Sequence, residues 1–442
     1  MVLNVVSLLL LTLPLTHGAM TVHTFGSSDA AVAKLAAAYE KSATVIFGPI
    51  LSHPGVVSDV YIYDAAREAT DKATWVTAIC NNKMHNEGQD PNCAGAYNNR
   101  PSMQTVAAAG QCGPPGTVDL SKCAGMVMHA GSTSGASSDL AESLVIPQRT
   151  FDLPSPLEGK GCCDDGGEKI AIHESWHLVS FYLTQSYTTR EGFAGGNPDS
   201  GTAQPYFGPY WLNEGMAEYV ALTRAALVPG YGYNLTQTLA HSFTGRRQQL
   251  IAHPECRLAG MHFLGEASWD GPCAGKVDFI NLGAWATALM VAKNLALPTP
   301  AGGKAQGERA ILVDLLVETS QRNLMPGVGF KEKVGMTVAA FEKEVEALFL
   351  VTPPLSAAAL FDKLFPQGPP TSVSVDFTGL SVAKSPTPSV PNASPTTGTT
   401  SGTGTTTDKT KVDAGTKSTL FTGHAAVSVA TLAAITLLLR WQ

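Results

Sequence analysis

The 442-residue sequence has little charge and no basic block. Only 15% of the residues are charged, and 29 basic side chains stand against 36 acidic ones, which gives a formal net charge of -7. Proteins that bind nucleic acid non-specifically neutralise its phosphates with Lys and Arg, so this balance argues against nucleic acid as a partner. Gross disorder is excluded as well, because 44% of the residues are hydrophobic and suffice for a core.

Large apolar side chains are missing from one long segment near the C-terminus. From Ala383 to Thr419 there is no aromatic residue and no Leu, Ile or Met, and the segment is rich in Ser, Thr, Pro and Gly. Such a composition buries too little surface to offset the entropy lost on ordering. We therefore predict a folded part over residues 19–372 and an extended stalk, of a type that carries O-linked sugars, over 373–415.

The N-terminus lacks a basic residue ahead of its apolar run, Val2 to Leu15. The run is too short to span a bilayer, and small residues follow it at Thr16 and Gly18. This pattern is typical of a secretory signal peptide over residues 1–18, cleaved after Gly18.

The last residues contain a second apolar segment, Ala425 to Leu439, followed only by Arg440, Trp441 and Gln442. Three small residues, Asp413-Ala414-Gly415, precede it with a spacer between, as in a glycosylphosphatidylinositol (GPI) anchor signal. The sequence thus predicts removal of residues 416–442 and a glycolipid anchor at Asp413, Ala414 or Gly415. The alternative is a single membrane-spanning helix, for which the tail is marginal in length and lacks a basic cluster. In both cases the folded part lies at the extracellular face of the membrane.

Eight cysteines agree with an exported protein, because an even number suits disulfides in an oxidising compartment. Up to four disulfides are expected, and the short-range pairs Cys112–Cys123 and Cys256–Cys273 are candidates. Cysteine-based zinc binding is disfavoured, since no paired C-x-x-C spacing is present.

Two N-glycosylation acceptors have the form N-x-S/T. Asn234 begins N-L-T and is the better one, whereas Asn392 begins N-A-S and is followed by Pro395.

The segment between the ends predicts an α+β fold. Residues 29–43 are typical of a helix, whereas 57–63 and 75–79 carry the β-branched and aromatic residues of strands. Residues 81–125 are rich in Asn, Gly, Pro and Cys and predict a disulfide-tied loop region. From Glu168 to the mid-340s the pattern is mainly helical, so a strand-rich N-terminal half precedes a helical C-terminal half.

The segment starting at Glu168 contains H-E-x-x-H, formed by His173, Glu174 and His177. Residues four apart share one face of a helix, so both histidines can bind one ion. Zinc would lower the pKa of a bound water to about 7, and Glu174 would accept its proton as general base. Apolar neighbours predict that this helix is buried; they are Ile170, Ile172, Leu178 and Phe181.

A catalytic zinc also needs a third protein ligand and an open position. The spacing H-E-x-x-H-x-x-G-x-x-H is absent, because Ser180 and Leu183 occupy its last two positions. A glutamate about 19 or 20 residues after the second histidine would fall on Gly196 or Asn197, and neither is a zinc ligand.

Instead, a second helix is predicted at W-L-N-E-G-M-A-E-Y, where Glu214 and Glu218 are four residues apart. One glutamate can bind zinc while the other accepts a hydrogen bond from a ligand histidine. This stretch resembles the third-ligand helix of gluzincin metallopeptidases, especially peptidase MA-like domains. The resemblance implies that Glu214 binds zinc, that Glu218 supports a histidine and that the fold is zincin-like. Trp211 and Tyr219 are interpreted as core residues.

The resemblance extends from about Ala36 to Leu350 and is strong only at the two zinc-binding helices. Residues 282–297 and 329–348 look like the closing helices of the family. In aminopeptidase-type members a tyrosine three residues before a helix glycine steadies the tetrahedral intermediate. With that glycine placed at Gly283, the position holds Ile280.

The residue that stabilises the oxyanion is therefore open, and the candidates are Tyr231, Tyr233, His241 and His262. The G-x-M-E-N signature that captures a free amine in aminopeptidases is missing too, which favours an endopeptidase.

These observations predict a secreted, cell-surface zinc metallopeptidase that acts on a peptide or protein substrate with one Zn²⁺ per chain. Two alternatives stay open. The first is a surface binding or adhesion protein that keeps a zinc site without turnover. The second is a zinc hydrolase that acts on a non-peptide substrate. Retention of Glu174 argues against the first, since a structural site needs no general base and closes its fourth position.

Overall fold

The computed structural model describes residues 20–26, 30–51, 56–81, 91, 93–98, 123–132, 142–147, 167–184, 209–261, 273, 276–299, 305–321 and 326–380. The predicted signal peptide, the anchor signal with Asp413, Ala414 and Gly415, and Asn392 lie outside these ranges, as does the stalk beyond Leu380. Within the described residues, no helix is both long and apolar enough to cross a membrane.

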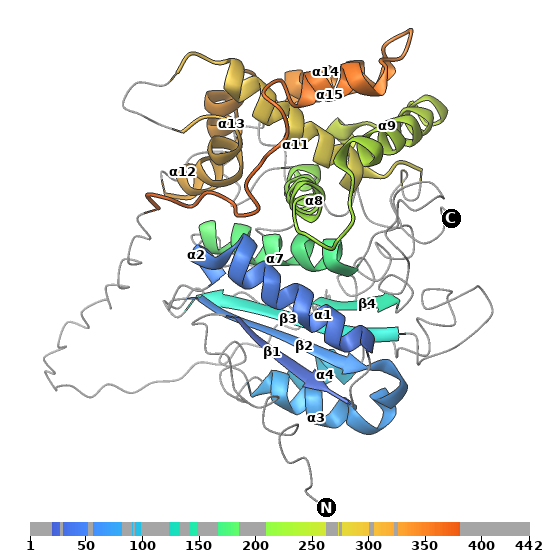
Figure 1. Cartoon of the computed structure of the whole chain (residues 1–442), viewed down its shortest axis with the longest axis vertical. Coiled ribbons are helices and arrows are strands. Elements are labelled where there is room, and N and C mark those ends of the chain that lie inside the picture. The colour runs from blue at the N-terminus through green and yellow to red at the C-terminus, as the bar shows by residue number, and fades with distance from the viewer. Residues whose placement is uncertain are drawn as a thin grey trace, which may run out of the picture.

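The N-terminal half is built on a mixed four-stranded sheet in the order β1-β2-β3-β4 (Figure 1). β1 Met20–Phe25 pairs in parallel with β2 Val56–Asp64, so that His23 lies beside Tyr61. β3 Cys123–Ser132 pairs antiparallel with β2, and β4 Glu142–Pro147 pairs antiparallel with β3. The strand predicted over 57–63 is thus confirmed as part of β2.

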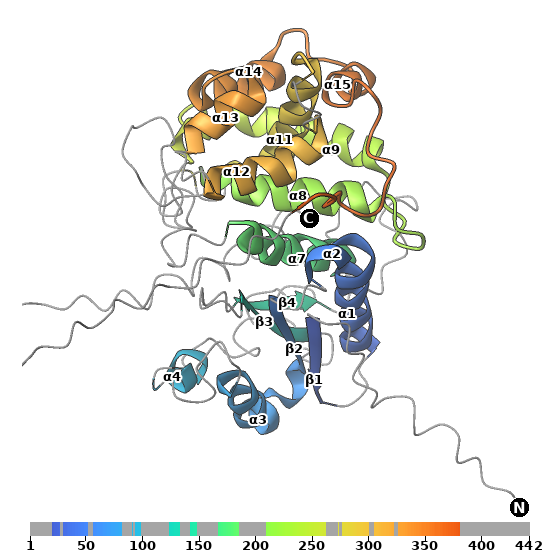
Figure 2. The same ribbon diagram turned by 90° about the vertical axis from the view of Figure 1, so that its left-hand side faces the viewer.

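A helical crossover joins the two parallel strands, as parallel pairing requires. It consists of α1 Ala30–Lys41, a π-helical turn at η1 Ser42–Ile46, and the single turn α2 Gly48–Leu51. This confirms the helix predicted over 29–43. α1 and α2 cover the face of the sheet that is turned toward the rest of the helices (Figure 2).

The opposite face of the sheet carries the short η2 Ala65–Arg67, α3 Glu68–Cys80 and α4 Cys93–Asn98. The strand predicted over residues 75–79 is wrong, because these residues form the end of α3. Their aromatic and β-branched side chains pack onto the sheet: Trp75 is 2% exposed and stacks on Tyr63 of β2 with ring centroids 4.8 Å apart.

Among the described residues, two disulfides fasten connecting segments. Cys80–Cys93 ties the end of α3 to the start of α4 and so joins the predicted loop region, residues 81–125, to the helix before it. That region is not loop throughout, because it contains α4 and the start of β3. Cys256–Cys273 confirms one of the two predicted pairs. The other, Cys112–Cys123, lies outside the description because Cys112 does.

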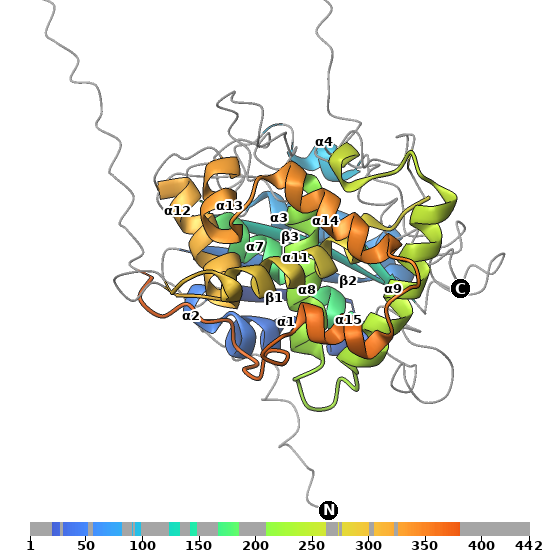
Figure 3. The same ribbon diagram turned by 90° about the horizontal axis from the view of Figure 1, so that it is seen from above.

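The C-terminal half is helical, as predicted, and Figure 3 shows it lying over the sheet rather than beside it. The helices that carry or enclose the site are α7 Gly167–Leu183, α8 Tyr210–Ala225 and α11 Phe279–Ala296. The others are α9 Leu235–Ala252, η6 Leu258–Gly260, η7 Ala310–Asp314, α12 Leu315–Gln321, α13 Pro326–Val334, α14 Val338–Leu350 and α15 Ala357–Leu364.

The segment predicted as a closing helix over 329–348 is broken into α13 and α14. Gly335 follows α13 with φ +81°, a left-handed conformation that glycine adopts without steric cost. Thr337 then caps α14, and its hydroxyl accepts a hydrogen bond from the Ala340 amide.

The packed chain continues past residue 372, where we predicted the stalk to begin. Val375 and Phe377 are 3% and 6% exposed, and the Val375 amide donates to the Ile46 carbonyl oxygen of η1. The Arg309 guanidinium donates to the carbonyl oxygens of Asp376 and Thr378. This C-terminal strap, residues 373–380, connects the helical half to the sheet half.

Candidate metal centre

The H-E-x-x-H segment forms a helix, α7, between the sheet layer and the C-terminal helices. Ile172 and Leu178 are buried and Ile170 is half-buried, which confirms the prediction of a buried helix; the side chain of Phe181 is outside the description. Trp176, with its whole side chain buried, packs near Phe47 with ring centroids 6.0 Å apart. These contacts on the core side leave the histidine face of α7 turned toward α8.

The W-L-N-E-G-M-A-E-Y segment opens α8, a helix buried almost all round. Every residue of α8 except Tyr210 and Glu214 is buried. A helix of this kind is a central core element. Glu214 is therefore a point at which this buried helix is in contact with solvent, while Trp211 and Tyr219 are core residues, as predicted.

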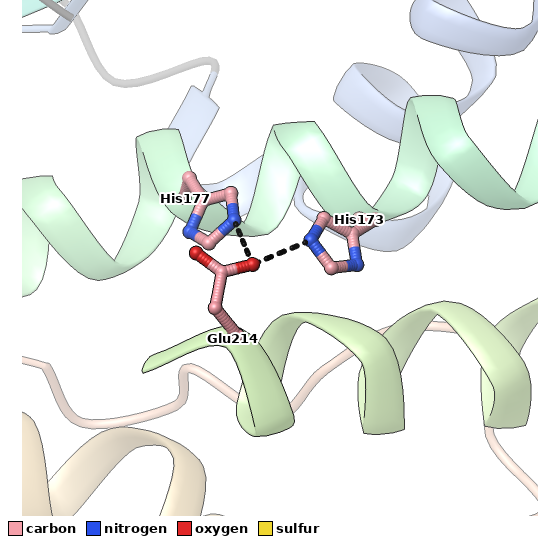
Figure 4. A group of neighbouring side chains, drawn as sticks. All are labelled: His173, His177 and Glu214. Atoms are coloured by element: carbon pink, nitrogen blue, oxygen red, sulfur yellow. Dashed lines mark hydrogen bonds and ion pairs between the residues drawn. The ribbon is translucent and has the colours of Figure 1, made fainter. Parts of the chain in front are cut away.

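Three predicted ligands converge between the two helices (Figure 4). The Glu214 Oε2 atom lies 3.3 Å from His173 Nε2 and 3.6 Å from His177 Nε2. One ligand atom from each of the three residues lies within 4.8 Å of the others. The side chains are 10%, 12% and 15% exposed for His173, His177 and Glu214, so the cluster is enclosed but not sealed.

The donor set fits zinc. Zinc sites of the catalytic type combine imidazole nitrogens and a carboxylate oxygen at about 2.0–2.2 Å, and tetrahedral ligands at that distance lie about 3.3–3.5 Å from each other. The two separations above are close to this spacing. A metal held here by two histidines and one glutamate would keep one position open.

A pair of glycines fixes how closely α8 approaches α11. A Cβ atom on Gly215 would overlap the Gly283 backbone, and one on Gly283 would lie 2.5 Å from the Trp211 carbonyl oxygen. The two backbones therefore touch directly beside Glu214. The Trp211 indole also donates to Glu342 Oε1 at 2.8 Å, which ties α8 to α14.

Glu218 supports His173 as predicted, and the structure adds a partner that the sequence reasoning missed. Glu218 Oε2 accepts from His173 Nδ1 at 3.0 Å, while Oε1 accepts from the Lys169 ammonium at 2.6 Å. Lys169 is 4% exposed. The spacing of Lys169 in the sequence could have identified it as this partner, since a lysine four residues before His173 lies on the same face of α7.

The pKa values of the two histidines reflect their pairing with the glutamates. Burial alone lowers the pKa of His173, but hydrogen bonds to Glu214 and Glu218 outweigh it and hold that pKa well above its usual value. Burial also lowers the pKa of His177, and the charge of Glu214 raises it above its usual value.

The pKa values of the two carboxylates, Glu214 and Glu218, change in the opposite direction to those of the histidines. Burial raises the pKa of Glu214, yet the histidines lower it strongly overall. For Glu218 burial acts the same way, while Lys169 and His173 bring its pKa down. Both glutamates are therefore anions, which is the form that binds a cation or accepts a hydrogen bond.

Glu174, the predicted general base, lies one residue after His173 and is 9% exposed. Its charge raises the pKa of both histidines.

The structure describes three of the four candidates for oxyanion stabilisation, Tyr231, Tyr233 and His241. The Tyr231 ring has Lys41 Nζ 5.1 Å from its centre, and burial together with the charge of Glu168 raises its pKa to about 12. Tyr233 packs against the core, and His241 is exposed on α9, which packs on α14 and α15. His262 lies outside the described residues, and Ile280 is a half-buried residue of α11.

The predicted glycosylation acceptor Asn234 is exposed and caps α9. Its side-chain oxygen accepts from the Gln237 amide at 3.1 Å. The side-chain nitrogen, to which a glycan attaches, is not used by this cap.

Comparison with known proteins identifies no relative: no family model, no curated protein and no solved structure matches this chain. The functional interpretation therefore rests on the residues of the cluster.

Proposed function

We propose that the protein is a zinc metallopeptidase with a zincin-like fold of the gluzincin type. The observation that carries this proposal is the convergence of His173, His177 and Glu214 from α7 and α8. Glu174 follows His173 directly in the sequence of α7. A structural zinc site would use four protein ligands, whereas this cluster supplies three and a carboxylate suited to base catalysis.

The chemistry divides between the metal and the chain. Zinc, when bound, supplies Lewis acidity that polarises a carbonyl and makes water acidic near neutral pH. His173, His177 and Glu214 hold it, and Glu174 accepts the proton of the attacking water and then donates it to the leaving amine. Glu218 accepts the Nδ1 proton of His173, which directs the Nε2 atom of that histidine toward Glu214.

Endopeptidase activity is the preferred form of this proposal. The signature that captures a free amine in aminopeptidases is missing from the sequence, which favours an endopeptidase over an aminopeptidase.

We further propose that the enzyme is exported and held at the outer cell surface by a glycolipid anchor. The disulfides Cys80–Cys93 and Cys256–Cys273 suit an oxidising compartment, and Asn234 is accessible for glycosylation. Release of the protein from intact cells by a phosphatidylinositol-specific phospholipase is expected. Retention after that treatment would favour the membrane-spanning alternative.

The decisive experiment compares the purified protein with its Glu174→Gln variant on an unbiased peptide library read by mass spectrometry. The parent should cut peptides internally, and the variant should lose about 10²–10⁴-fold in rate while it keeps its zinc. Glu255→Gln is a matched control, because Glu255 is an exposed glutamate that pairs with Lys276. It should leave the rate unchanged.

The outcomes separate the alternatives. Internal cuts that vanish with a chelator and with Glu174→Gln support the endopeptidase, and cuts restricted to peptide ends indicate an exopeptidase. A protein that binds one zinc and cuts nothing favours a binding protein or a non-peptide substrate.

A further inference from the structure

The zinc ligands are part of a longer ladder of alternating charge between α7 and α8. From one end to the other it runs Lys169, Glu218, His173, Glu214 and His177, with successive residues drawn from opposite helices. The i, i+4 spacing on each helix produces this alternation, because it stacks the side chains of each helix on one face.

The ladder is tight at one end and open at the other. Its successive contacts measure 2.6, 3.0, 3.3 and 3.6 Å from Lys169 to His177. Lys169 and Glu218 have side chains only 5% and 3% exposed, whereas Glu214 is 15% exposed. The metal ligands thus occupy the open end, and the ion pair closes the other.

The Glu218 carboxylate divides its two oxygens between Lys169 and His173. A carboxylate with one oxygen committed can still rotate about its last bond, whereas two fixed partners leave a single orientation. From this geometry we infer that Lys169 is a positioning residue of the zinc site, which fixes Glu218 so that Glu218 can fix the imidazole of His173.

This inference rests on the proposed function and deepens it. Residues that support a metal ligand through a hydrogen bond alter metal affinity by about 10–100-fold when they are changed. The charge of Lys169, considered by itself, acts in the opposite direction, because removing a cation favours binding of another cation. The sign of the change in zinc affinity therefore separates positioning from simple electrostatics.

The experiment measures zinc affinity of the full chain by competition with a chelating dye, and the visible spectrum of the Co²⁺-substituted protein. Lys169→Met should weaken zinc binding by about 10–100-fold and change the Co²⁺ spectrum. Lys333→Met is the matched control, because Lys333 is also a buried lysine that binds a glutamate of a neighbouring helix, Glu318, at 3.0 Å. It should lose stability and leave zinc affinity and the spectrum as in the parent.

A double-mutant cycle tests whether Lys169 acts through Glu218. In a Glu218→Gln background, Lys169→Met should weaken zinc binding no further. This comparison uses only the Glu218→Gln and double variants, so it is still available if Lys169→Met alone does not fold.

Unchanged or tighter zinc binding in folded Lys169→Met overturns the inference, as does a further loss in the Glu218→Gln background. Either result leaves the proposed function standing if the parent binds one zinc and cuts peptides. A parent that binds no zinc overturns both.

Discussion

The two ends of α8 bury charge in opposite ways. Near its start, Glu214 and Glu218 belong to a ladder in which each carboxylate contacts two partners. Near its end, Arg224, with a side chain 0% exposed, donates through NH1 and NH2 to the two oxygens of the 23% exposed Glu308 at 2.7 and 2.6 Å. The same helix thus carries a cluster with shared carboxylates and an ion pair between one guanidinium and one carboxylate.

The difference teaches that burial of charge does not by itself mark a functional site. At Arg224 each oxygen of the Glu308 carboxylate accepts from one nitrogen of the same guanidinium, which is a strong bidentate pair. At Glu214 one carboxylate oxygen is shared by two imidazoles, and three potential ligand atoms point to a common place. Convergence of ligand atoms, rather than charge, distinguishes the start of α8.

The largest expected effect is obtained by removing a ligand from the cluster at the start of α8. His177→Ala removes a ligand and should lower turnover by about 1000-fold or more, because the metal contributes several kcal/mol to catalysis. Zinc affinity should fall further than in any Lys169 variant. Metal analysis and peptide cleavage are the measurements, and a His177→Ala protein that keeps zinc and full activity contradicts the ligand assignment.

Breaking the Arg224–Glu308 ion pair near the end of α8 should affect stability instead. Glu308→Gln leaves Arg224 buried without its counter-charge and should cost about 3–5 kcal/mol in the free energy of unfolding. Glu344→Gln, which removes the 43% exposed partner of Lys293, should cost less than about 1 kcal/mol.

Denaturant unfolding compares the two variants, and zinc affinity should be unaffected in both. If Glu308→Gln loses zinc but no stability, the distinction between the two ends of α8 is wrong.

A smaller effect is expected where α8 touches α11. Gly283→Ala forces a methyl group against the Trp211 carbonyl and should cost about 1–3 kcal/mol, with weaker zinc binding because α8 must move. Gly245→Ala is the control: this α9 glycine has open space around it, and alanine there should stabilise the protein by about 0.4–1 kcal/mol. Equal effects in the two variants would contradict the close-contact argument.

The smallest effect is that of zinc on stability. At a free zinc concentration ten times Kd, the metal adds about 1.4 kcal/mol to the free energy of unfolding. A chelator should therefore lower the Tm of the parent by a few degrees, and it should lower that of His177→Ala by less. A thermal melt with and without chelator measures this, and equal shifts would show that zinc binds elsewhere.

The sequence predicted the convergence of His173, His177 and Glu214 because the information for it is local. H-E-x-x-H and E-x-x-x-E each place two ligands on one helical face, and only the meeting of the two helices had to be assumed. Lys169 was missed although its spacing indicated the correct face, since a lysine there is ordinarily exposed. The Arg224–Glu308 pair joins residues far apart in sequence, and no local pattern predicts it.

The errors in the fold have a similar cause. The residues of α3 that resembled a strand, Trp75 to Ile79, use their aromatic and branched side chains to pack a helix onto the sheet. Packing overrode local propensity there. The break between α13 and α14 depended on the backbone conformation of Gly335, which composition alone does not specify.

The C-terminal strap has a mechanical consequence. Tension applied to the chain beyond Leu380 would load the hydrogen bonds from Arg309 to Asp376 and Thr378, and then the bond from Val375 to Ile46. These bonds anchor the strap at the junction of the two halves, so a pull would be borne first by Arg309 and by Ile46 of η1. A tether attached at this end would therefore load the edge of the helical half rather than act directly on His173, His177 and Glu214.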